Sequence, residues 1–162
     1  SRLLVQNVVT GCATMINAAL RERAAPIPVE AVMHDWWLAL AAAAFGTIEA
    51  IERPTLLYRQ HGSNDTGAKR WGCRYVAGQV RRFGGAGGLG DRLRRAQRQA
   101  GAFADRYGGE LAPACEAAAR AYATIGRRSA LGRRCQLFRH GLWMHGRAGM
   151  SLVKNLGLLL RI

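Results

Sequence analysis

A lone carboxylate, Asp35, stands next to His34 at the start of an apolar stretch that continues with Trp36 and Trp37. Packing alone rarely places such a polar pair there, because buried polar groups need partners. A carboxylate can accept a proton in general base catalysis, and indole rings offer flat apolar faces. The four residues predict a site for a polar, ring-shaped substrate. In the alternative interpretation, Asp35 only caps a helix and the indole rings pack in the core.

A second polar cluster follows in the segment 58–64, with the sequence YRQHGSN. It contains Arg59 and His61 and comes directly after a short apolar segment. Because loops at the ends of core elements collect functional groups, we predict that Arg59 and His61 share one concavity with Asp35 and that Trp36 lies on its wall. The alternative is that both residues fix the conformation of a turn.

Apolar and β-branched residues predict strands on both sides of two helices. Asn17 can cap the first helix, which must end before Pro26 because the residue before a proline leaves the α region. The second helix is apolar all round, which predicts burial on all sides, and Gly46 ends it. The elements are a strand, turn and strand at 3–16, helices at 18–24 and 35–45, and strands at 47–52 and 55–58. This order predicts part of an α/β layered domain.

The chain becomes helical and rich in arginine after about residue 70. The glycine-rich stretch 81–90 is typical of a flexible joint. Three- and four-residue spacing then predicts one apolar helix face over 91–107, formed by Leu93, Ala96, Ala100, Phe103 and Tyr107. Pro113 suits the first turn of the next helix, and two further helices are predicted at 129–143 and 151–161. We therefore divide the chain into 1–70, a linker at 71–90 and a helical tail at 91–162.

The net charge of +14 is concentrated in the second part of the chain. Residues 1–70 carry seven Lys or Arg and six Asp or Glu, whereas residues 71–162 carry seventeen and four. Such asymmetry indicates an anionic partner, either a nucleic acid or a membrane surface. A codon bias toward arginine explains the same numbers, and both interpretations stay open. The four cysteines contain no C-x-x-C pair, so reduced thiols are expected rather than a zinc site.

Three sequence blocks resemble the latter half of a family 2 glycosyltransferase of the bacterial rhamnosyltransferase-like type, which acts in cell-surface polysaccharide synthesis. They are NVVTGCATMIN, AVMHDWWLALAAAAFG and PTLLYRQHGSN, in this order within about residues 3–70. The resemblance implies the second half of a GT-A fold, which is an α/β fold, followed here by the mainly helical basic tail. It also implies inverting transfer of a sugar from a nucleotide-sugar donor to a saccharide or lipid-linked acceptor.

The resemblance assigns Asp35 as the general base, in a position that the family usually writes as Glu-Asp and that reads His34-Asp35 here. It makes His34, Trp36, Trp37, Arg59 and His61 candidates for substrate binding, with His61 also near the diphosphate or its metal. A divalent metal, Mg²⁺ or Mn²⁺, is implied in the full-length enzyme. The family's Asp-x-Asp metal motif does not occur in this sequence. We therefore expect a piece of a longer protein that is inactive alone because its donor-binding half is missing.

The tail residues 127–161 mix arginines with leucines and a tryptophan, and no apolar run reaches the length that crosses a bilayer. This pattern suits the headgroup layer of an anionic membrane, although packing on the catalytic part explains the leucines equally well. We expect a cytoplasmic protein, with peripheral attachment to the inner face of the cytoplasmic membrane left open. The competing hypotheses are a basic nucleic-acid-binding module, for which no recognition motif is found, and an inactive remnant of a truncated gene.

Overall fold

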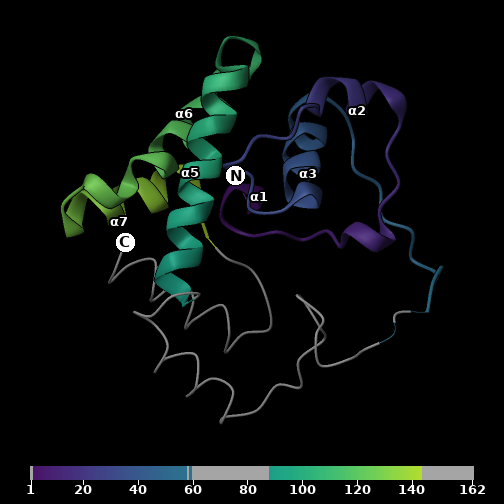
Figure 1. The fold of residues 1–162 in the computed structure, drawn as a ribbon. Helices are drawn as coiled ribbons and strands as arrows, with labels where there is room; N and C mark the ends of the chain where they lie inside the picture. The colour runs from purple at the N-terminus through teal and green to yellow at the C-terminus, as the bar shows by residue number, and fades with distance from the viewer. Residues whose placement is uncertain (1, 58, 60–87, 144–162) are drawn as a thin grey trace.

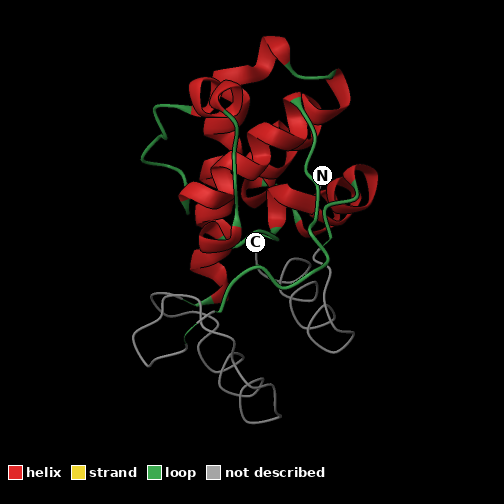
Figure 2. Ribbon diagram, turned by 90° about the vertical axis from the view of Figure 1, so that its right-hand side faces the viewer, coloured by secondary structure: helices red, strands yellow, loops and turns green. Residues whose placement is uncertain are grey.

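A computed structural model describes residues 2–57, 59 and 88–143 of the chain, which form helices joined by loops (Figure 1, Figure 2). The α-helices are α1 (Arg2–Val5), α2 (Ala18–Ala24), α3 (His34–Phe45), α5 (Leu89–Tyr107), α6 (Pro113–Ala123) and α7 (Ala130–His140). Short 3-10 helices lie at Gly11–Ala13, Gly108–Glu110 and Ile125–Arg127. None of the described residues is in a β-strand. The predicted α/β fold, the second half of a GT-A fold, is therefore wrong for this part of the chain.

Several of the described segments have residues that favour strands, but their backbones have no neighbouring strand to pair with. Thr10 and Thr14 do have extended backbone angles, yet a strand is stable only when a neighbouring strand binds its N–H and C=O groups. Residues 47–57 likewise form no ladder. The apolar residues of α1 pack as a helical turn instead, so that Leu4 and Val5 are buried against the core.

Both helices predicted between residues 18 and 45 are confirmed, together with the residues that bound them. The side chain of Asn17 accepts a hydrogen bond from the backbone N–H of Leu20 at 2.9 Å, as an N-cap does. Helix α2 ends at Ala24, before Pro26, and α3 ends where Gly46 donates its N–H to Ala42 O at 2.9 Å. Helix α3 is not buried on all sides, because Ala43 is exposed.

The helices of the tail also follow their sequence signals. All five residues of the predicted apolar face of α5 are buried: Leu93, Ala96, Ala100, Phe103 and Tyr107. Pro113 occupies the first turn of α6. Ser129 caps α7, and Gly141 ends it with a φ of 59°, a left-handed conformation that glycine adopts without strain. The helix predicted at 151–161 lies outside the described residues.

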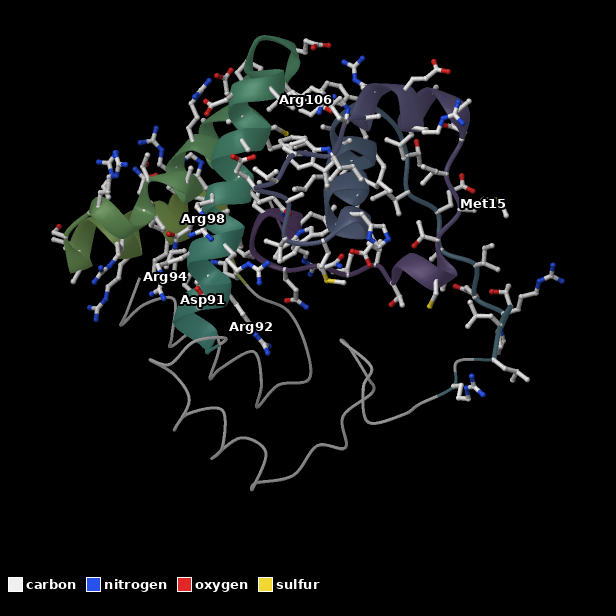
Figure 3. The ribbon with its side chains drawn as sticks, in the orientation of Figure 1. Met15, Asp91, Arg92, Arg94, Arg98 and Arg106 are labelled. Atoms are coloured by element: carbon white, nitrogen blue, oxygen red, sulfur yellow. The ribbon has the colours of Figure 1, made fainter. Side chains whose placement is uncertain are left out.

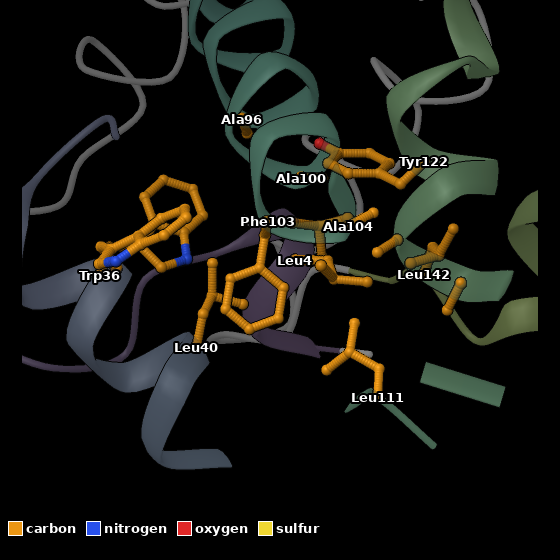
Figure 4. Packing of buried hydrophobic residues seen from close by; sticks show 14 of the residues in the cluster. Leu4, Trp36, Leu40, Ala96, Ala100, Phe103, Ala104, Leu111, Tyr122 and Leu142 are labelled. Carbon is orange, nitrogen blue, oxygen red and sulfur yellow. The ribbon is translucent and has the colours of Figure 1, made fainter. Parts of the chain in front are cut away.

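One apolar core joins the described parts of segments 1–70 and 91–162. Trp37 of α3 is fully buried, with its ring centroid 5.4 Å from that of Phe103 and 6.1 Å from that of Tyr107, both on α5. Figure 4 shows the residues of this cluster, in which Leu40 and Phe103 lie beside Leu4 and Leu111. The aromatic contacts therefore fix α3 against α5.

Polar contacts hold the C-terminal end of α5 on the turn that follows α2. Arg106, at this end of the helix (Figure 3), donates to the backbone oxygens of Pro26 at 2.6 Å and Arg23 at 3.2 Å, and also to that of Ala25. Tyr107 Oη donates to Arg23 O at 2.8 Å. These bonds satisfy carbonyls that a helix end leaves without intrahelical partners. They connect the basic tail to the segment that leads into α3.

Candidate functional site

Asp35 lies in the first turn of α3 and is only 3 % exposed. Its Oδ1 accepts a hydrogen bond from Asn7 Nδ2 at 3.1 Å, and its Oδ2 accepts one from the N–H of Gly11 at 2.8 Å. The residue in the cap position is Met33, whose side chain makes no cap hydrogen bond. Asp35 is therefore not the helix cap. Its carboxylate instead connects the start of α3, where the helix dipole favours negative charge, to a distant loop.

The loop that holds Asp35 is itself ordered by Asn7. The Oδ1 of Asn7 accepts a hydrogen bond from the N–H of Val9 at 3.0 Å. Because this bond occupies the carbonyl end of the amide, the Nδ2 end must face Asp35. The two bonds of Asn7 thus fix one donor on the carboxylate without adding a positive charge.

Gly11 lies in close contact with the first two residues of α3. A Cβ added there would lie 2.9 Å from His34 Nε2 and 3.3 Å from Asp35 Oδ2. A side chain at position 11 would therefore displace the His34 imidazole and crowd the Asp35 carboxylate. The imidazole of His34 lies against Gly11 while the residue as a whole is exposed, so His34 forms the solvent-facing border of the site.

Both tryptophans lie within the protein. Trp37 is fully buried and its Nε1 donates to Ala24 O at 3.1 Å. Trp36 is 8 % exposed, and its Nε1 donates to Leu3 O. Their indole groups are thus engaged in packing and in backbone contacts. That Trp36 or Trp37 binds substrate stays a prediction.

The second predicted cluster is only partly described. Arg59 is exposed, and His61 lies outside the described residues. Whether Arg59 and His61 share a concavity with Asp35 therefore stays a prediction. Within residues 2–57, 59 and 88–143, no three His, Cys, Asp or Glu side chains are grouped so that they could hold a metal ion. The Mg²⁺ or Mn²⁺ that the resemblance implies stays a prediction, because most of the residues expected to bind it are not part of this sequence.

Asn7 and Gly11 are the site residues that the sequence analysis missed, since the segment 3–16 that contains them was predicted only as a strand, turn and strand. The contact between Asn7 and Asp35 spans 28 residues. No local spacing rule connects positions that far apart, because helix and strand periodicities describe near neighbours only. The one local signal is the tendency of Asn to bind the backbone two residues further on, which Asn7 shows with Val9.

Comparisons with known proteins return no match to a protein-family model, a curated protein or a solved structure. Among the helices of the described residues, none has the length and apolar character needed to cross a membrane.

Proposed function

We propose that this chain carries the general base of a glycosyltransferase and that Asp35 is that base. The observation that carries the proposal is a buried carboxylate, held at the start of α3 by two uncharged donors. Within the part of the chain that the structure describes, no Lys or Arg forms an ion pair with it. The similarity of the surrounding sequence blocks to family 2 glycosyltransferases supports sugar transfer as the reaction.

The hydrogen bonds of Asp35 leave acceptor capacity for a substrate. An ionised carboxylate has about four acceptor positions, and Asn7 and Gly11 each occupy one. In the proposed reaction, the hydroxyl oxygen of the acceptor attacks the anomeric carbon of a nucleoside-diphosphate sugar while Asp35 takes the hydroxyl proton. The glycosidic bond forms as the bond to the diphosphate breaks, and the nucleoside diphosphate leaves with the electron pair. Attack from the side opposite the diphosphate inverts the anomeric centre.

In this proposal, the acceptor reaches Asp35 from the side on which His34 lies. The loop residues Asn7 and Gly11 occupy one side of the carboxylate, and His34 is the exposed residue next to it. An imidazole can donate and accept hydrogen bonds, so His34 is the side chain best placed to orient an acceptor hydroxyl. Limited water around the carboxylate strengthens the electrostatic interactions made there.

The test must separate a catalytic role of Asp35 from its role in holding the loop. Asp35→Asn removes the base, and it also removes one of the two loop contacts. The exchange variant Asn7→Asp/Asp35→Asn can form all three hydrogen bonds again. Its new carboxylate accepts from the N–H of Val9 and from the new amide, and that amide accepts from the N–H of Gly11. The variant can therefore restore the structure, but its carboxylate is at position 7 and no longer at position 35.

Activity is measured on protein made from the complete coding sequence, as transfer of radiolabelled sugar from a panel of nucleoside-diphosphate sugars to acceptors extracted from the producing cells. We expect Asp35→Asn and the exchange variant each to lose at least about 100-fold in turnover, the scale of a lost general base. Activity of the exchange variant close to wild type would assign Asp35 a purely structural role. Absence of transfer by the wild type with every donor would contradict the proposed reaction.

A further inference from the structure

An apolar hollow of about 420 Å³ lies between α1, α3, α6 and the C-terminal end of α7. Its volume is within the range of about 300–1,000 Å³ that is typical of small-molecule sites. Part of its wall comes from buried residues of the core: Leu4, Leu40, Phe103, Leu111, Ala118 and Ala119. Figure 4 shows Leu4, Leu40, Phe103 and Leu111 together in this region. Apolar walls of this kind suit a hydrocarbon chain.

Three basic residues line the same hollow. They are Arg2 at the start of α1 and Arg139 and His140 in the last turn of α7, and no Asp or Glu is among the lining residues. Within the described residues, neither Arg2 nor Arg139 forms an ion pair. Ala114 and Cys115, in the first turn of α6, line the hollow as well, and that helix end has no side-chain cap. The positive charges of Arg2 and Arg139 favour an anion beside the apolar walls.

We propose that this hollow binds a lipid phosphate, with one hydrocarbon chain on the apolar walls and the phosphate against Arg2, Arg139 and His140. Arginine guanidinium groups match phosphate oxygens through paired hydrogen bonds. Two arginines and an imidazole provide donors for several oxygens at once, which suits a phosphate better than an uncharged head group. The site is separate from Asp35, which does not line it. If the hollow binds no lipid phosphate, the proposed role of Asp35 as a base is unaffected, and a failure of the Asp35 proposal leaves the lipid proposal unaffected.

Cys115 provides a reporter inside the hollow. Its side chain is exposed and lines the site, whereas Cys12 and Cys135 are exposed and lie outside it. The full chain is treated with a limiting amount of iodoacetamide, and alkylation of each cysteine is followed by peptide mass spectrometry. We expect dodecyl phosphate, below its micelle concentration, to slow alkylation of Cys115 at least about fivefold while the rates at Cys12 and Cys135 stay unchanged.

Two further compounds separate the contributions of chain and charge. Dodecyl maltoside has the same chain with a neutral head, and inorganic phosphate has the head without a chain. We expect weaker protection by the maltoside and none by phosphate. If dodecyl maltoside protects Cys115 as well as dodecyl phosphate does, the charged head group makes no contribution and the proposal is overturned. Equal protection by inorganic phosphate would show a site for a free anion and overturn it as well, as would equal slowing at all three cysteines.

Substitutions at the border of the hollow complete the test. Arg139→Ala should weaken protection by dodecyl phosphate about tenfold, the usual scale for a charged hydrogen bond. Arg134→Ala is the matched control, since Arg134 is exposed on the same helix and does not line the hollow. Ala43→Leu places a larger side chain at an exposed lining position and should also weaken binding. An equal effect of Arg134→Ala and Arg139→Ala, or unchanged binding in Ala43→Leu, would contradict the site.

Discussion

The contact between Asn7 and Asp35 makes a quantitative prediction about stability. In Asp35→Asn, the new side chain can still accept the Gly11 N–H, but its amide group then faces the Nδ2 of Asn7. Asn7 cannot turn over without losing its bond from Val9. One hydrogen bond to a charged group is thus lost, at about 1.5–3 kcal/mol, and the remaining one is weakened. Loss of the anion at the start of α3 adds about 0.3–1 kcal/mol.

We therefore expect Asp35→Asn to lower the free energy of unfolding by about 2–4 kcal/mol. Asn7→Asp alone should also be destabilising, because two carboxylates then face each other. The exchange variant Asn7→Asp/Asp35→Asn should return to within about 1 kcal/mol of wild type, since all three hydrogen bonds can form again. The resulting coupling energy between positions 7 and 35 should be at least about 2 kcal/mol.

The assay is urea unfolding followed by tryptophan fluorescence, because Trp36 and Trp37 are both buried and next to Asp35 in sequence. Free energies from linear extrapolation for the wild type, both single variants and the exchange variant complete the cycle. A loss below about 0.5 kcal/mol in Asp35→Asn, or additive effects in the exchange variant, would refute the hydrogen-bond geometry on which the site is built.

Three further predictions concern the helical part of the chain. Arg106→Ala should lower the free energy of unfolding by about 1–3 kcal/mol, because three carbonyl contacts disappear, and Arg106→Lys should restore little of it in the same urea assay, since an ammonium cannot reach all three. Burial raises the pKa of Tyr122, so the stability that this residue contributes is present below the pKa of about 10 of an unfolded tyrosine and is lost as the pH rises above it, by up to about 1.4 kcal/mol per pH unit. Between pH 8 and 11, the free energy of unfolding measured with urea should fall less steeply with pH in Tyr122→Phe than in the wild type. Equal slopes in the two proteins would contradict the burial of Tyr122. Leu131 and Phe138 are 72 % and 67 % exposed on α7, so the double change to Ser should reduce co-sedimentation with anionic vesicles at low salt; unchanged recovery would remove α7 from membrane contact.

The courses of α2, α3, α5, α6 and α7 could be predicted from the sequence because their signals are local, whereas α1 was predicted as part of a strand. Asn17 caps α2 through a backbone N–H three residues away, and the apolar face of α5 repeats every three or four residues. Such interactions form within one or two turns of the chain. The predicted strands failed because a strand depends on a partner that its own sequence does not specify.

The surroundings of Asp35 depended on contacts between distant segments. The residue types of Asp35 and His34 and their place at the start of a helix were evident from sequence alone. Only the tertiary structure decided that Asn7 and Gly11 hold the carboxylate, that Trp37 packs on α5, and that Arg106 attaches the tail to the turn after α2. Local propensity selects conformations of short segments, whereas burial and long-range hydrogen bonds select which segments meet, and the second choice determines the environment of Asp35.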